Sequence, residues 1–141
     1  MGRIKFSKLI QDDYKEFGRE GSKAITAAGK AGWKAAVQIN NYYVHTGSLR
    51  ANWKLSTRMD YYEPVRYGSK DNPRPAPNVP DFKYRITKDK GVYIFNNMKY
   101  ADKVEYGMGP GARSPALMIP AAKVAFTREA MDRFDRIIIG W

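Results

Sequence analysis

The chain has 141 residues, 43% of them hydrophobic and 13% aromatic, which predicts one folded domain with a substantial core. It contains no cysteine, which excludes disulfides and thiolate metal sites, and no apolar run approaches the roughly 20 residues of a membrane span, so we expect no membrane partner. Lys and Arg number 25 against 14 acids, a formal net charge of +11, so we expect attraction to polyanions, nucleic acid first, with a basic solvated surface that binds nothing specific as the alternative.

The first element expected is a helix over residues 5 to 40. In its first half, apolar side chains recur at intervals of three and four, through Phe6, Leu9, Ile10, Tyr14 and Phe17. Small residues continue this face from Ala24 to Ile39, and we expect the whole stripe to be core, with a partner-binding face as the alternative. Gly18 and Gly21 each weaken a helix by about 1 kcal/mol relative to Ala, which leaves a break between its halves as an open alternative.

A tight corner is expected at Thr46 and Gly47, because Gly adopts positive φ without strain. If the chain is extended after this corner, Leu49 and Trp53 share one face and Arg50 lies on the other. The corner then sends the chain from helix to strand and places Trp53 in the core.

Several β-prone stretches follow the corner. Residues 53 to 57 alternate apolar with polar side chains, which predicts a half-buried strand. Residues 61 to 67 are also β-prone, but Pro64 interrupts them and suggests an edge strand. Residues 82 to 86 and 92 to 95 flank a Lys-Asp-Lys-Gly turn, so we expect these two stretches to pair as a hairpin.

Two loops are expected outside these elements. The first spans residues 68 to 80 and contains Pro73, Pro75 and Pro77, which disfavour helix and strand alike. At about 13 residues it is long for a compact domain, so we expect it to be mobile or to dock on a neighbour. The second loop spans residues 107 to 115 and is rich in Gly and Pro.

The last expected element is a helix from about Pro115 to Ile138. Proline is tolerated only in the first turn of a helix, so Pro120 places the start near Ile119. The chain ends in apolar residues that include Ile139 and Trp141, and we expect them to dock on the chain's own core or on another subunit. The predicted fold is therefore α+β, a single domain over 1–141 with a long N-terminal helix, a small mostly antiparallel sheet, and a C-terminal helix packed on that sheet.

The residues that catalysis or metal binding would need are sparse. His45 is the one histidine, no nucleophile motif lies near it, and the acids are dispersed without a spacing that favours acid–base chemistry. We therefore expect no enzyme activity, no metal and no cofactor.

Two motif stretches, read together with the helices around them, resemble a known family. The first is Thr46-Gly47-Ser48-Leu49-Arg50-Ala51-Asn52-Trp53, and the second is Tyr100-Ala101 followed by Val104-Glu105-Tyr106-Gly107. A Gly/Pro loop then leads through Pro115, Met118 and Pro120 into the C-terminal helix. This order resembles the tail-component family of tailed double-stranded DNA bacteriophages, which comprises head–tail joining and tail-completion (neck) proteins, and the resemblance covers most of the chain.

The resemblance implies a structural virion protein. Its α+β subunits assemble into a homo-oligomeric ring in the neck, which joins the head connector to the tail and surrounds the DNA channel. The implied partners are copies of the chain itself, neighbouring neck, connector and tail proteins, and double-stranded DNA bound non-specifically in the lumen. The alternative is a stand-alone basic nucleic-acid-binding protein of another class.

The two stretches also predict roles for individual residues. Arg50 and Glu105 each lie in a stretch with an aromatic residue and close to a Gly, so they are expected to pair, with two solvated charges as the alternative. Trp53 and Tyr106 are expected in the core, with ligand contacts as the alternative. The candidate subunit contacts are Pro73, Pro75, Pro77, Met108, Pro110, Ile139 and Trp141. If the pairing is right, charge reversal at Arg50 or Glu105 disrupts assembly.

Overall fold

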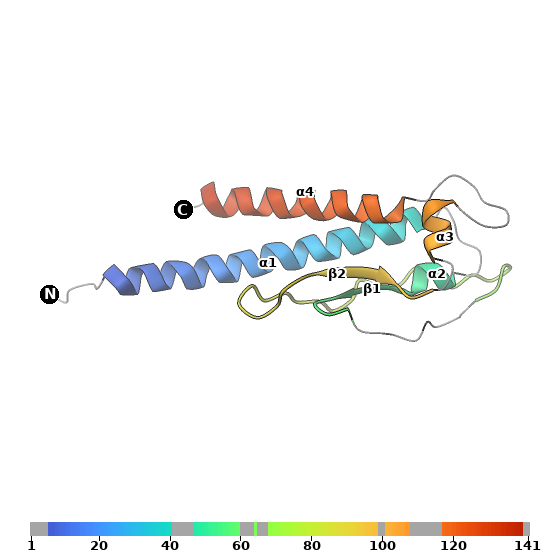
Figure 1. Cartoon of the computed structure of the whole chain (residues 1–141), viewed down its shortest axis with the longest axis horizontal. Coiled ribbons are helices and arrows are strands. Elements are labelled where there is room, and N and C mark those ends of the chain that lie inside the picture. Colours follow the sequence, from blue (N-terminus) through green and yellow to red (C-terminus); the bar gives the residue numbers. More distant parts are fainter. Residues whose placement is uncertain are drawn as a thin grey trace.

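The computed structural model describes residues 6–40, 47–59, 64, 68–98, 101–107 and 117–139; for residues 6–14, 40, 102–104 and 136–139 it describes the backbone alone. The elements follow the order α1 (Phe6–Asn40), α2 (Ser48–Ala51), β1 (Trp53–Ser56), β2 (Tyr93–Asn96), α3 (Ala101–Tyr106) and α4 (Met118–Ile139). Helix α1 lies between α4, which runs antiparallel to it, and the β1–β2 sheet (Figure 1). The predicted α+β fold is confirmed.

Helix α1 is continuous across Gly18 and Gly21, so the break between its halves does not occur. The small side chains of α1 allow other elements to pack closely on two sides of the helix. At Gly32, a Cβ atom would lie 2.7 Å from Cδ1 of Ile94 in β2 and 3.0 Å from the carbonyl oxygen of Ala122 in α4. A helix this close to both neighbours has no room for a side chain there, and α1 therefore joins the two outer layers.

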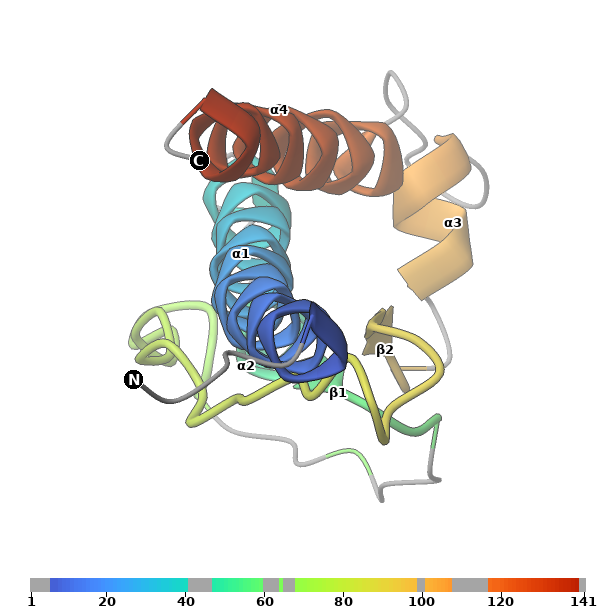
Figure 2. The same cartoon turned by 90° about the vertical axis from the view of Figure 1, so that its left-hand side faces the viewer.

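Helix α4 packs along α1 (Figures 1 and 2), and its residues Met118 and Ala122 share the core cluster with Trp53 and Leu55 of β1. Near its far end, the rings of Phe17 and Phe134 lie 6.5 Å apart between centroids. The helix begins at Met118, which keeps Pro120 in the first turn as predicted. The core is formed jointly by all layers, and its largest members include Trp33, Trp53, Phe82, Met98 and Met118. No helix of the described residues is long and apolar enough to cross a bilayer.

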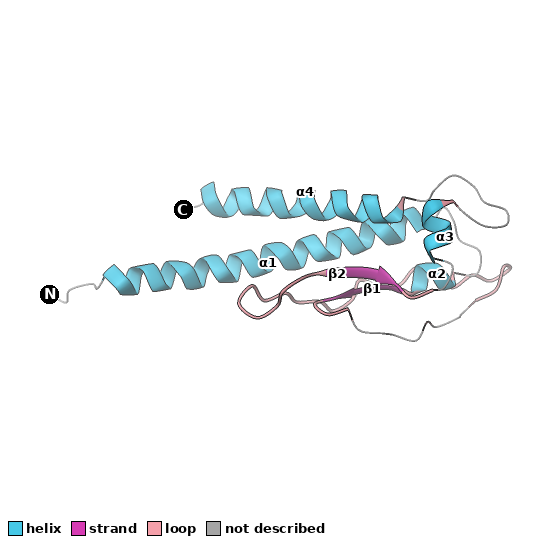
Figure 3. Ribbon diagram, viewed as in Figure 1, coloured by secondary structure: helices cyan, strands magenta, loops and turns pink. Residues whose placement is uncertain are grey.

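The sheet differs from the predicted hairpin. Strand β2 pairs antiparallel with β1, with Trp53 opposite Asn96 and Ser56 opposite Tyr93 (Figure 3). Residues 82–86 form no strand, and residues 68–92 as a whole contain neither helix nor strand. The prediction that 82–86 and 92–95 form a hairpin is therefore wrong, whereas the strand at 53–56 and the loop at 68–80 are confirmed. The β-prone residues 61–63 and 65–67 lie outside the described part of the chain.

Residues 82–86 instead run along α1, where two hydroxyls bind their backbone. The amide of Tyr84 donates to Oγ1 of Thr26 at 2.9 Å, and the amide of Ile86 donates to Oγ of Ser22 at 3.0 Å. These side chains replace the partners that a neighbouring strand would supply. The alternation of Phe82, Tyr84 and Ile86 correctly identifies one inward face, but the surface that receives it is a helix.

Candidate functional site

The first motif stretch builds a corner around Gly47. This residue has φ of 83°, in the left-handed region that favours glycine, and Cα of Arg74 lies 2.8 Å from where a Cβ would stand. The guanidinium of Arg50 donates to the carbonyl oxygen of the same Arg74. The 68–80 loop thus docks at this point on the corner of its own chain. Thr46, the other corner residue, lies outside the described residues.

The segment after the corner is a short helix, so the prediction that Leu49 to Trp53 is extended is wrong. The amide of Ala51 donates to the carbonyl of Gly47 at 3.0 Å, which closes one turn of α2. The buried residues are Ser48, Leu49, Asn52 and Trp53, a helical spacing that a period of two does not reveal. Asn52 is buried because its side-chain amide donates to the carbonyl of Ser48 at 2.6 Å.

Two hydrogen bonds connect this turn to the rest of the fold. The indole of Trp33 in α1 donates to the carbonyl of Trp53 at 3.0 Å, and the side-chain amide of Asn96 in β2 donates to the carbonyl of Leu49 at 2.7 Å. Trp53 is buried in the core, as predicted. The corner therefore fixes the start of the sheet relative to α1.

The second motif stretch forms α3 and caps α4. The carboxylate of Glu105, only 4% exposed, accepts hydrogen bonds from the amides of Met118 at 2.8 Å and Ile119 at 3.0 Å. A negative charge at a helix N-terminus is stabilised by the free N–H groups and by the helix dipole. The predicted Arg50–Glu105 pair is wrong, since each residue binds backbone groups elsewhere.

The remaining motif residues lie around this cap. Ala101 packs against the core, and Gly107 ends α3 with φ of 68°. Tyr106 is 62% exposed, so its predicted core position is wrong. Tyr100 lies outside the described residues. The first stretch contributes Leu49 and Trp53 to the core cluster, and Ala101 of the second stretch packs against that cluster.

The predicted subunit contacts are described only in part. Pro73 and Pro75 are exposed, Pro77 is half-buried, and Ile139 is the last residue of α4. Three further residues of that set, Met108, Pro110 and Trp141, lie outside the described residues.

Three exposed apolar side chains lie along α4 and at its start: Val124 and Met131 belong to the helix, and Leu117 directly precedes its first residue. Leu117, Val124 and Met131 are 55%, 56% and 61% exposed, and each stands seven residues after the last. Seven residues are close to two helical turns, so Val124 and Met131 share one face, which Arg128 also occupies. We name Leu117, Val124 and Met131 the α4 row. Its seven-residue spacing is the signal that could have identified it.

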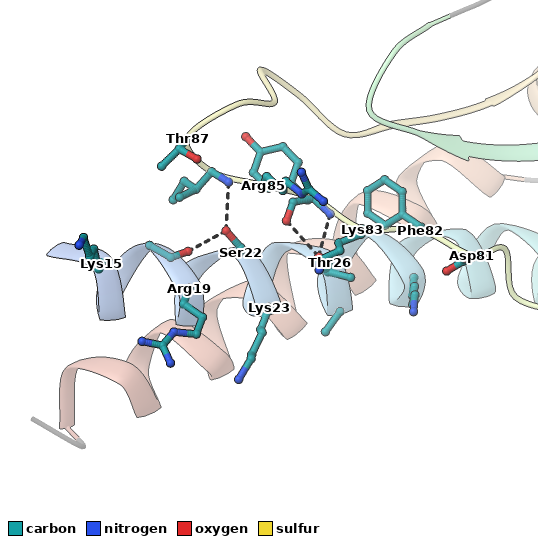
Figure 4. A pocket seen from close by; sticks show the side chains of 15 residues that line it. Lys15, Arg19, Ser22, Lys23, Thr26, Asp81, Phe82, Lys83, Arg85 and Thr87 are labelled. Atoms are coloured by element: carbon teal, nitrogen blue, oxygen red, sulfur yellow. Dashed lines mark hydrogen bonds between the residues drawn. The ribbon is translucent and has the colours of Figure 1, made fainter. Parts of the chain in front are cut away.

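A basic groove lies between α1 and the 81–87 segment, with a volume of about 890 Å³. Its cationic side chains are Lys15, Arg19, Lys23 and Lys30 from α1, and Lys83 and Arg85 from the segment. Figure 4 shows Ser22 and Thr26 pointing to the segment, while Arg19 and Lys23 point away from it. Among the described residues that line the groove, Asp81 is the one acid.

The charge of the basic groove is largely uncompensated. Lys23 lies 3.2 Å from Glu20 on the same helix, and the described residues place no acid within salt-bridge distance of Lys15, Arg19 or Lys30. These four α1 cations fall within about 80° of arc. In the sequence, the four-residue spacing of Lys15, Arg19 and Lys23 was the available signal for this clustering.

The groove offers binding chemistry for anions. The described residues contain no group of three or more His, Cys, Asp or Glu side chains that could hold a metal ion. Comparisons with protein-family models, with curated proteins and with solved structures find no significant match. The function is therefore argued from the α4 row, the basic groove and the motif stretches themselves.

Proposed function

We propose that the chain is a structural protein of the tailed-phage neck, where its copies form a ring that joins the head connector to the tail around the DNA channel. The observation that supports this most directly is the α4 row. Large apolar side chains on one helix face are costly to leave in water, and a ring of identical subunits covers them. Arg128 on the same face suits a subunit contact, because arginine is enriched at protein interfaces.

The proposal also draws on charge and on the two motif stretches. A formal net charge of +11 suits a protein that holds DNA without reading its sequence. The order of the corner, the Glu105 segment and the C-terminal helix carries the resemblance to neck proteins. The loops and the α4 row would then meet neighbouring subunits and the adjoining connector and tail proteins.

The first test is the mass of the purified protein in solution, measured by light scattering alone and after mixing with isolated heads or tails. We expect a ring-sized species, or a monomer that becomes a ring on a virion part. A stable monomer that ignores both parts and binds duplex DNA tightly at low salt would contradict the proposal. That outcome would favour the alternative, a stand-alone basic nucleic-acid-binding protein.

A pair of substitutions tests the α4 row itself. We expect Val124→Ser/Met131→Ser to lower the mass of the assembled species to that of smaller units, because it removes apolar surface from the subunit contact. Lys123→Ser is the matched control, since Lys123 is exposed on the same helix but points about 100° away from Val124. Equal effects of the control and the double variant would assign the contact to another surface.

A further inference from the structure

We propose that the basic groove binds the phosphate backbone of duplex DNA, which makes it the DNA-facing surface of the subunit. The choice of duplex DNA as the partner rests on the proposed neck function, whereas the groove itself is defined by the residues that line it. Six cations and one acid are among the described residues that line this one groove. The groove itself therefore attracts a polyanion, in addition to the net charge of the whole chain. The groove cations from α1 lie across that helix from Phe17, whose ring packs on Phe134 of α4, so packing leaves them open.

The dimensions of the groove fit a backbone. Lys15 and Lys30 are fifteen residues apart, which is about 22 Å along the helix. One strand of a duplex presents a phosphate charge per roughly 3.4 Å of its axis, or about seven phosphates over that length. One backbone strand therefore offers about as many phosphates as the groove has cations.

The chemistry of the lining favours a duplex over a single strand. Proteins that hold single strands stack bases on exposed aromatic rings. Phe82 is buried against α1, and the hydroxyl of Tyr84 donates to the carbonyl of Asp89 at 2.9 Å, so neither ring forms an open platform. The described lining contains no Asn or Gln, and the hydroxyls of Ser22 and Thr26 are used in binding residues 84 and 86. The groove thus supplies charge without base-edge recognition.

The test measures duplex affinity of the full chain by fluorescence anisotropy across a salt series. If all six cations contact phosphates, the slope of log K against log salt is about −5, and the affinity falls roughly 10³-fold between 50 and 200 mM salt. Lys15→Gln/Lys83→Gln removes one exposed cation from each wall, and we expect the slope to become shallower by about 2. Lys70→Gln/Lys123→Gln is the matched control, because it removes the same charge from two exposed lysines that do not line the groove.

The control variant shows whether duplex binding depends on the charges of the groove or on the net charge of the whole chain. An unchanged slope in the control together with a shallower slope in the groove variant supports the proposal. Equal changes in both variants, or no binding at low salt, would overturn it. Polyglutamate at equal charge concentration is tested as a competitor of the duplex. If it competes with the wild-type protein but not with the groove variant, the groove binds an acidic protein, and the proposal is overturned. Thermal unfolding of each variant confirms that the fold is intact.

Light scattering on the same samples separates this proposal from the neck proposal. A groove variant that keeps the ring mass and loses duplex affinity supports the groove as the DNA contact of a ring. Groove-dependent DNA binding by a chain that stays monomeric, even with heads or tails present, supports the groove and contradicts the ring. If the chain forms a ring and the groove variant binds DNA as well as the wild type, the result supports the ring and contradicts the groove as the DNA contact.

Discussion

Glu105 provides the sharpest test of how the second motif stretch holds the C-terminal helix. Its carboxylate binds the amides of Met118 and Ile119 in a site that is almost fully buried. Glu105→Ala leaves both amides without this acceptor and removes the charge that faces the helix dipole. Loss of a helix cap costs about 0.5–2 kcal/mol, and hydrogen bonds to a charged group contribute about 1.5–3 kcal/mol each. Because the two bonds share one carboxylate, we expect a total loss of about 3 kcal/mol.

The measurement is thermal and urea unfolding followed by circular dichroism. At this chain length, 1 kcal/mol corresponds to about 4 °C, so Glu105→Ala is expected to lower the midpoint by roughly 12 °C. Glu105→Gln keeps one acceptor oxygen but turns a donor toward the other amide, and we expect an intermediate loss. Glu129→Ala is the control, because Glu129 forms a partly exposed pair with Arg133 at 2.7 Å that is worth less than about 0.5 kcal/mol. If Glu105→Ala costs no more than this control, the cap does not stabilise α4.

Four further substitutions, each followed by urea unfolding, test the close approaches at three glycines and the hydrogen bond that docks residues 82–86 on α1. Gly32→Ala is expected to destabilise the protein by about 1–3 kcal/mol, because its Cβ would overlap side-chain and backbone atoms; Gly18→Ala, whose nearest neighbour would lie at 3.6 Å, should instead stabilise it by about 0.5–1 kcal/mol. Gly47→Ala should cost at least 1–2 kcal/mol, since it adds strain at positive φ to a backbone overlap. Thr26→Val should cost about 1–3 kcal/mol by leaving the amide of Tyr84 unpaired, and hydrogen exchange at that amide should accelerate; an unchanged rate would contradict the pairing.

The two long helices and the first strand were predictable because their signals are local. The three-and-four spacing from Phe6 onward, the position of Pro120, and the alternation from Trp53 each depend on a few neighbouring residues. The hairpin prediction failed for the opposite reason. Residues 82–86 carry a strand-like alternation, but whether a strand or a helix receives that face depends on Ser22 and Thr26, about sixty residues earlier. A period of two identifies the buried side without identifying what buries it.

The functional residues were harder to predict than the fold. Arg50 and Glu105 look like a pair in the sequence because both are charged and lie in motif stretches, yet each satisfies backbone groups of a corner or a helix end. Lys83 and Arg85 join Lys15 in one groove only because their segment docks on α1. Charges that appear scattered along the chain are thus gathered by tertiary structure, and a count of like charges in sequence cannot detect this.

Helix α1 shows why the core and the proposed DNA surface depend on the same sequence pattern. Small residues such as Gly21 and Gly32 let α4 and the sheet approach closely on their sides of the helix. Because α4 and the sheet occupy those sides of α1, the 81–87 segment docks beside Lys15 and Arg19. Its backbone amides donate hydrogen bonds to the hydroxyls of Ser22 and Thr26 and do not use the cationic side chains. The lysine and arginine side chains therefore stay exposed beside a docked segment that adds two more cations. If Gly32→Ala separates the layers, it should weaken folding, while duplex affinity of the folded fraction should persist, because the groove lies on another face of α1.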